Sequence, residues 1–347
     1  MASLTLWVVI LLASWKLGCL YLRKRRSQLL ARLKDCHALN ACTLFVEFPF
    51  LYRLAFEYGL MKTAGIPAIT RRVKTGGEAV HNPAKRYDDT DILIRELLLH
   101  HVDTPRGSLA VRRLNFLHSH YNIHNQDYIY VLAIHILTVI EWASMFGYRE
   151  WTELEKSTHY KVWHDIGTRM GMRDIPATLA DLAQYKEDYE AKYMVFAKEN
   201  HEFAEIGMKL LLDDVPKLLW PFGRRVLISV MDDRLVASLG YSKQPHWLTF
   251  MSHALLKLHG VVVSWMPPRP LSWAQTRIAV SMFSGCPILQ QADGQLPLAY
   301  QRFPPIPYPQ GYRIAEIGGK KAGMLSSPFK GGSLQCPLRS TPNISDM

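Results

Sequence analysis

The N-terminal residues place the strongest constraint on what this chain can fold into. Residues 3–22 read SLTLWVVILLASWKLGCLYL, a run of 20 residues in which Lys16 carries the only charge. About 20 apolar residues in a helix are enough to cross the hydrocarbon core of a bilayer. A cleaved signal peptide would have a basic residue before the apolar run and a small-x-small motif after it, and this chain has neither. The sequence therefore predicts an uncleaved, single transmembrane helix over residues 1–22.

Basic residues follow this run at once. The RKRR motif at 23–26, with Arg32 and Lys34, places six positive charges and no negative charge between residues 23 and 34, whereas residues 35–302 are close to neutral in a chain of net charge +11. A protein that binds nucleic acid carries its basic patch on the folded body, so this pattern excludes nucleic acid as a partner and indicates a membrane surface. The positive-inside rule places the body of the chain in the cytosol.

The rest of the chain predicts an all-α fold, because helical periodicity is common in it and alternating strand patterns are scarce. Residues 23–42 are expected to form a basic juxtamembrane linker, residues 43–318 a helical domain, and residues 319–347 a flexible tail rich in Gly, Ser and Pro. Thr152 and Glu155 form a capping box that starts one of the helices. The expected helices cover residues 43–60, 89–101, 106–122, 126–147, 152–170, 177–196, 199–213, 224–239, 246–265 and 271–283.

The stretch 126–147 is the most apolar one after the N-terminal run. It is apolar on almost all sides, which is typical of a buried core helix. Asp127, His135 and Glu141 interrupt it. A second transmembrane span is the alternative interpretation.

Several common functional classes lack their motifs here. The five cysteines form no CxxC pair, which argues against a disulfide framework and a cysteine-rich zinc module. The chain contains no GxxxxGK[ST], GxGxxG or GxSxG motif, so the usual signatures of nucleotide binding and acyl hydrolysis are absent.

Histidines are the most suggestive candidates for chemistry, since the chain has 14 of them. His118, His120 and His124 lie close together in sequence, and His135 stands alone in the apolar stretch. A buried histidine needs a partner, and two alternatives are open for His135. It is either a neutral core histidine bonded to a backbone carbonyl or the axial ligand of a haem held between helices.

A haem also carries two propionates, which arginine side chains can bind. Arg112 and Arg113 precede the apolar stretch, and Arg169 lies one helix after it. The alternative for these three residues is an ordinary position on the surface or in an ion pair.

The stretch from Arg112 to Pro176 resembles the family of ER-bound MpaB oxygenases and rubber oxygenases. The similarity covers roughly residues 45–318, and the central block is the most specific part because unusual residues keep their spacing over about 65 positions. The matching residues there are Arg113, His118, Asp127, Tyr130, Leu132, Trp142, Gly147, Tyr148, Arg149, Trp163, Gly167, Arg169, Met170, Asp174, Ile175 and Pro176. Shorter matches are KRYDDT at 85–90, PPRP at 267–270 and GYRIAEIG at 311–318.

The resemblance implies a helical, globin-like core around haem b, so that residues 43–318 would be the oxygenase domain. It implies His135 as the iron ligand, Arg112, Arg113 and Arg169 as haem-binding residues, and His118 and Arg113 as catalytic residues. The rubber enzymes have a lysine and a threonine above the haem, and the segment from Leu114 to His118 has neither. Relatives of the MpaB type are anchored in the ER membrane and use O₂ to cleave a C=C bond in a prenylated, hydrophobic small molecule of secondary metabolism.

Three other functions are alternatives to this one. A haem-thiolate monooxygenase needs an axial cysteine, and after WPFGRR at 220–225 no cysteine occurs before Cys286. A membrane di-iron hydroxylase needs several histidine boxes, and His120 with His124 supplies only part of one. A non-catalytic haem-binding membrane protein is the third alternative.

Overall fold

The computed structural model of the chain describes residues 2–274, 277, 293–298 and 307–318. Within these ranges it is helical, with one isolated antiparallel bridge between Leu296 and Tyr312 and no strand, so the predicted all-α fold is confirmed. The expected helix 271–283 and the expected tail 319–347 lie largely outside the described residues.

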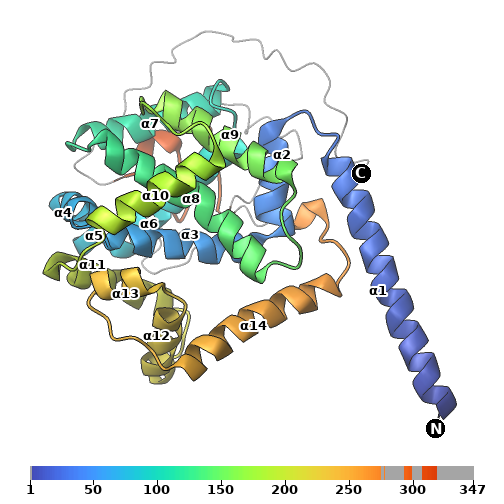
Figure 1. Cartoon of the computed structure of the whole chain (residues 1–347). Helices are drawn as coiled ribbons and strands as arrows, with labels where there is room; N and C mark the ends of the chain where they lie inside the picture. Colours follow the sequence, from blue (N-terminus) through green and yellow to red (C-terminus); the bar gives the residue numbers. More distant parts are fainter. Residues whose placement is uncertain (1, 275–276, 278–292, 299–306, 319–347) are drawn as a thin grey trace.

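The helices follow one another with short connections (Figure 1). The α-helices are α1 (Ala2–Leu30), α2 (Cys36–Cys42), α3 (Pro49–Ala64), α4 (Pro67–Thr75), α5 (Glu78–His81), α6 (Pro83–Leu99), α7 (Pro105–Ser119), α8 (Asn125–Phe146), α9 (Glu153–Arg169), α10 (Leu179–Tyr193), α11 (Lys198–Leu212), α12 (Trp220–Ser229), α13 (Asp233–Ser238) and α14 (His246–Ser264). A π-helical turn, η1 (Thr43–Glu47), joins α2 to α3, and 3₁₀ turns form η2 (Lys217–Leu219), η3 (Leu271–Trp273) and η4 (Ile314–Glu316).

Local signals explain where many of these helices begin. Proline stands in the first turn of α3, α4, α6, α7 and α12, where its missing N–H costs nothing. The predicted capping box of α9 is present, with Thr152 accepting from the Glu155 N–H and Glu155 accepting from the Thr152 N–H. The expected single helix 224–239 is wrong, because Asp232 caps a new helix by accepting a hydrogen bond from the Leu235 N–H.

Helix α8 is the centre of the body. It packs against α3, α9, α10 and α14, and its residues 132–134 and 136 are buried. One close approach is to α3 at Gly59, where a Cβ atom would lie 2.8 Å from the Cγ2 atom of Ile134. Any larger side chain at this position would push the two helices apart.

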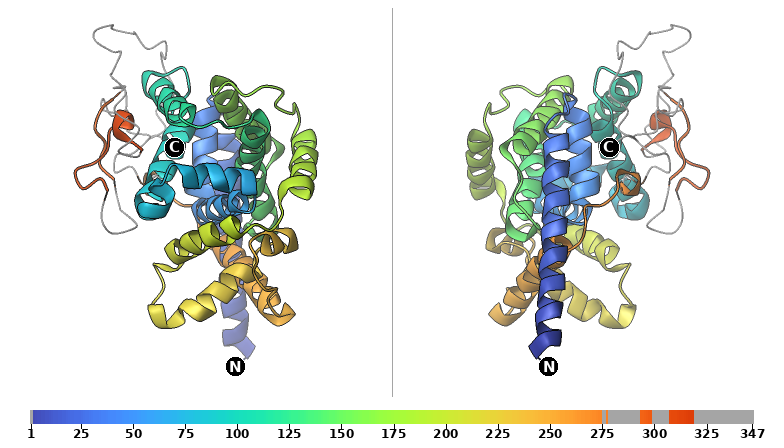
Figure 2. Two further views of the ribbon diagram at one scale, coloured as in Figure 1. Left: turned by 90° about the vertical axis from the view of Figure 1, so that its left-hand side faces the viewer. Right: turned by 90° about the vertical axis from the view of Figure 1, so that its right-hand side faces the viewer.

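Helix α1 stands largely outside the body, and its N-terminal half extends beyond it (Figures 1 and 2). Residues 23–30 of the expected linker continue α1, and residues 36–42 form α2. Two described helices are long and apolar enough to cross a membrane, α1 from Leu4 to Leu30 and α8, and the bent pair Cys36–Glu47 and Pro49–Ala64 would be a third if it formed one span. The apolar window is 6% buried in α1 and 67% buried in α8, which agrees with the expected core position of α8.

Candidate active site

His135 lies in the middle of α8 with its ring between two aromatic side chains. The imidazole stacks on Trp163 of α9, with ring centroids 4.8 Å apart and planes 3° apart, and its other neighbour is Phe56 of α3, at 5.8 Å and 22°. Within the described part of the chain neither ring nitrogen has a hydrogen-bond partner. Burial lowers the pKa of His135 from 6.5 to about 4. The ring is therefore neutral at pH 7 and keeps a nitrogen lone pair for a ligand.

His159, one helix away, lies beside the backbone carbonyl of His135 itself. Its Nε2 atom lies 3.3 Å from the carbonyl oxygen of His135, and its Nδ1 atom lies 2.7 Å from the amide oxygen Oδ1 of Asn40. Burial lowers the pKa of His159 to about 4, so this ring is neutral and donates through one nitrogen only. If the Nε2–H donates to the His135 carbonyl, Nδ1 must accept a hydrogen bond. Exchanging the oxygen and nitrogen of the Asn40 amide places at Nδ1 an amide nitrogen that has no other partner among the described residues. His159 thereby holds the backbone of α8 at the residue that presents the free imidazole.

His118 lies near the end of α7 and is also neutral. Its Nδ1 atom is buried and has no hydrogen-bond partner in the part of the chain that the structure describes, and its ring centroid is 5.5 Å from that of Tyr128 in α8. Burial, helped by the nearby charge of Arg86, lowers the pKa of His118 to about 4. His120, two residues later, is exposed, and its ring nitrogen binds the Phe116 carbonyl at 2.8 Å.

The three arginines expected to bind a haem occupy different surroundings. Arg113 is 1% exposed, and its Nε–H donates to the Ile317 carbonyl at 2.7 Å. Arg112, its neighbour in α7, is half-buried. Arg169 lies at the surface, where it pairs with Asp103. The structure thus collects Arg112, Arg113 and His118 on one helix and places Arg169 in an exposed ion pair.

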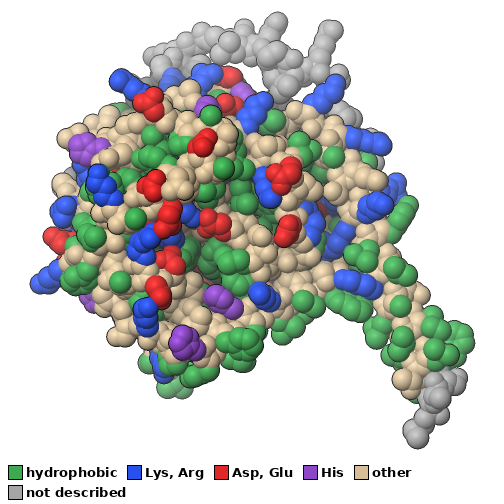
Figure 3. Space-filling model, in the orientation of Figure 1, with side chains coloured by type: hydrophobic (Ala, Val, Ile, Leu, Met, Phe, Trp, Pro, Cys, Tyr) green, Lys and Arg blue, Asp and Glu red, His purple; other side chains and the backbone are tan. Residues whose placement is uncertain are grey.

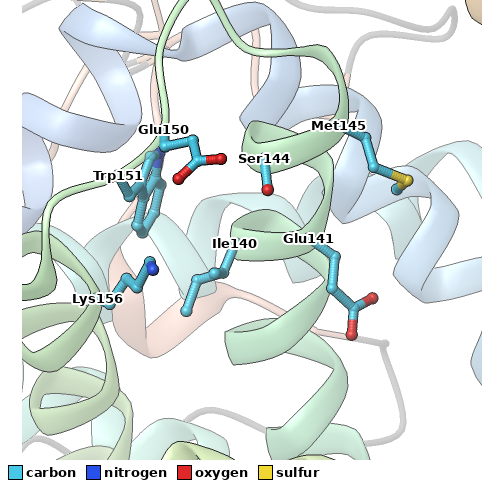
Figure 4. A pocket seen from close by; sticks show the side chains of 7 residues that line it. All are labelled: Ile140, Glu141, Ser144, Met145, Glu150, Trp151 and Lys156. Carbon is cyan, nitrogen blue, oxygen red and sulfur yellow. The ribbon is translucent and has the colours of Figure 1, made fainter.

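A hollow of about 440 Å³ opens beside the C-terminal half of α8 (Figure 4). Its lining consists of Ile140, Glu141, Ser144, Met145, Glu150, Trp151 and Lys156. Trp151 connects this hollow to the histidines, because its ring meets His159 edge to face at a centroid distance of 5.3 Å. A second hollow of about 270 Å³ shares Met145 and lies between α8 and α14. Both are within or close to the volume range of small-molecule sites.

Comparison with known proteins identifies the family. Residues 54–263 match the model of the catalytic domain described as "ER-bound oxygenase mpaB/B'/Rubber oxygenase". This chain belongs to that family. It is 28% identical to the ER-bound oxygenase mpaB' of Penicillium brevicompactum over 79% of this chain and 75% of the relative. It is 30% identical to the ER-bound oxygenase mpaB of Penicillium roqueforti over 64% of this chain and 80% of the relative.

Membership in the mpaB/rubber oxygenase family confirms the predicted resemblance and makes the chain an oxidoreductase of the oxygenase class. The matched span runs from α3 to α14 and contains all five predicted site residues. An oxygenase of this family acts on a small molecule with O₂ and implies a metal or haem cofactor. Among the described residues, no group of three or more His, Cys, Asp and Glu side chains could hold a metal ion.

Sequence reasoning missed a buried charge network on α6. Glu96 accepts from the Nε–H of Arg106 at 2.7 Å and also from the hydroxyl of Tyr312. Arg277 bridges Asp88 at 2.9 Å and Asp91 at 2.7 Å. These contacts hold distant parts of the chain against α6. The KRYDDT motif contains Asp88, but its partner stands 189 residues away, so spacing alone could not reveal the pair.

Proposed function

We propose that this oxygenase uses haem b to cleave a C=C bond in the prenyl side chain of a hydrophobic small molecule, as part of secondary metabolism. The observation that carries the proposal is the neutral imidazole of His135, which is held between two aromatic rings and has no hydrogen-bond partner among the described residues. One protein ligand is enough for a b-type haem, and neutral imidazole is the usual one.

The residues present fit a haem in their chemistry. His135 would coordinate the iron, and Arg112 and Arg113 would bind the propionates from α7. Arg169 is the third proposed propionate partner, and binding there requires it to exchange its surface contact with Asp103. Bound haem b supplies an iron that binds and activates O₂.

The protein's own side chains would orient the iron ligand, exclude water from it and provide a base for the substrate. Trp163 fixes the plane of the His135 ring by stacking on it, and Phe56 is a second, nearly parallel aromatic neighbour. His118 is the proposed base for an allylic proton, because the ring is neutral and its buried Nδ1 atom has no hydrogen-bond partner among the described residues. The hollow beside Trp151 and Ile140 would hold the apolar chain of the substrate.

Helix α1 would anchor this enzyme in the ER membrane by a single span with the body in the cytosol. Its apolar half is exposed and passes directly into the basic residues 23–26. A prenylated substrate partitions into the bilayer, so an anchored enzyme meets it at a high local concentration.

An absorption spectrum of the purified full-length protein, with metal analysis and an assay on prenylated phenols under ¹⁸O₂, tests this proposal. We expect a Soret band, one iron per chain, and carbonyl products that contain ¹⁸O. A Soret band without turnover of any prenylated substrate would identify a haem-binding protein without this activity. Two irons per chain and no Soret band would favour the di-iron alternative.

A further inference from the structure

Helix α14 has its polarity reversed with respect to an ordinary surface helix. Its outward face is apolar, and the exposed fractions of Phe250 and Leu255 are 70% and 66%. The exposed side chains along this face are Trp247, Phe250, Met251, Leu255, Leu258 and Val262. A contiguous apolar surface of this kind on one helix marks an interaction site.

Three polar side chains of α14 point toward the body instead. The ring of His253 contacts Phe146 at the end of α8, with centroids 5.4 Å apart, and the ring of His259 contacts Phe50 of α3 at 4.2 Å. The Ser252 hydroxyl lies 2.8 Å from that of Ser229 in α12. Gly260 fixes the position of the helix, because a Cβ atom there would be 2.5 Å from the Phe146 carbonyl oxygen. The apolar face is therefore held outward by packing on the other side.

The C-terminal end of α14 is bonded to α1. The Lys16 ammonium donates to the carbonyl and to the hydroxyl of Ser264, at 2.8 Å each, and Arg23 donates to the Val263 carbonyl at 2.7 Å. Trp15 donates from its indole nitrogen to the Trp265 carbonyl at 2.7 Å. Arg23 is the first of the basic residues, and Trp15 and Lys16 lie about two helical turns before it, in the last part of the apolar run. The bonds thus fix one end of α14 beside the last part of the apolar run of α1, next to the residues at which α1 would leave the hydrocarbon.

The figures show the same relationship for the whole molecule. Helices α12 and α14 lie along the edge of the body beyond which the N-terminal half of α1 protrudes (Figures 1 and 2). Hydrophobic side chains follow this edge and cover the protruding part of α1 (Figure 3). The turn η2 and the start of α12 add Leu218, Leu219 and Phe222, and Leu218 is 90% exposed.

We propose that α14 lies in the plane of the membrane interface, with its apolar face inserted among the lipid chains of the leaflet from which α1 emerges. This inference rests on the proposed function, in which α1 anchors the protein in the membrane. We name lipid as the material that covers the apolar face of α14, because this face is continuous with the apolar surface of α1. Helix α14 is not among the helices apolar enough to cross the bilayer. Interfacial helices of this type bury the apolar face about 5–10 Å deep.

Spin-label accessibility in the full-length protein tests the proposal. The protein is reconstituted in phosphatidylcholine vesicles, and single labels are introduced by Leu255→Cys and Leu258→Cys. Leu154→Cys on α9 is the matched control, since Leu154 is also an exposed leucine on a helix. A label at Leu11→Cys shows whether α1 itself lies in the lipid. The spectrum of the labelled parent protein is subtracted in each case, because the chain has its own cysteines.

We expect the labels at 255 and 258 to collide with O₂ more often than with a water-soluble nickel chelate, and the label at 154 to show the reverse. If the chelate reaches the labels at 255 and 258 while the label at 11 lies in lipid, the inference about α14 is overturned and the membrane anchor α1 is not. Poor access to both reagents would indicate a protein partner or a second copy and would also overturn it. Chelate access at Leu11 would contradict the anchor itself.

Discussion

The imidazole of His135 lies flat on the indole of Trp163, with ring centroids 4.8 Å apart and planes 3° apart. The two residues come from α8 and α9, and Trp163 belongs to the block that carries the family resemblance. The stack fixes the plane of the imidazole but occupies neither of its nitrogens. A ligand that binds through a nitrogen would therefore meet a ring whose orientation is already set.

Trp163→Ala should destabilise the protein by about 3–5 kcal/mol, because it removes a large buried side chain and leaves a cavity. Trp163→Phe keeps a flat ring beside His135 and should lower the free energy of unfolding by less than Trp163→Ala does. Urea denaturation measures both. If both variants lower the free energy of unfolding equally, a flat ring stacked on His135 does not contribute to the stability of the protein.

His159→Ala should lower stability by about 1–3 kcal/mol, since it leaves the Asn40 amide and the His135 carbonyl without their buried partner. Because His159 acts on the backbone of α8 and not on the proposed ligand position, the variant should still bind haem. Denaturation and the absorption spectrum are compared with those of wild type. Complete loss of the Soret band in a folded variant would move the ligand assignment from His135 to His159.

Stability should fall as the pH is lowered below 6.5. Burial lowers the pKa values of His37 and His118 from 6.5 to about 4. Between these pH values the unfolded chain takes up protons that the folded chain excludes, so each group removes about 1.4 kcal/mol per pH unit. His118→Gln should flatten the dependence of Tm on pH from 7 to 5. The same change at exposed His120 is the control, and an equal effect there would contradict the explanation.

Filling the hollow beside α8 should reduce turnover without changing the haem spectrum. Ser144→Trp places a large ring among the residues that line the 440 Å³ space. Ser157→Trp makes the same change at an exposed position of α9 outside it. With a prenylated substrate, only Ser144→Trp should raise KM or lower kcat, by tenfold or more. Unchanged kinetics in Ser144→Trp would show that the substrate binds elsewhere.

Features set by neighbours in sequence could be predicted, and features set by distant contacts could not. The helix that carries His135 and the capping box at Thr152 follow from local patterns. The pairing of Glu96 with Arg106 and Tyr312 depends on folding, as does the exposure of Leu255. Lys16 interrupts an apolar run, and only the structure shows the Ser264 carbonyl and hydroxyl that bind its charge. The break at Asp232 could have been read as a helix N-cap.

The absorption spectrum of His135→Ala, measured beside that of His120→Ala, tests the central claim most directly. His135 has no hydrogen-bond partner among the described residues, whereas His120 is an exposed histidine bonded to the Phe116 carbonyl. We predict that His135→Ala loses haem or shifts the Soret maximum, and that His120→Ala keeps the wild-type spectrum. A folded His135→Ala protein with full haem occupancy and an unchanged Soret maximum would contradict the assignment and make His118 the next candidate ligand.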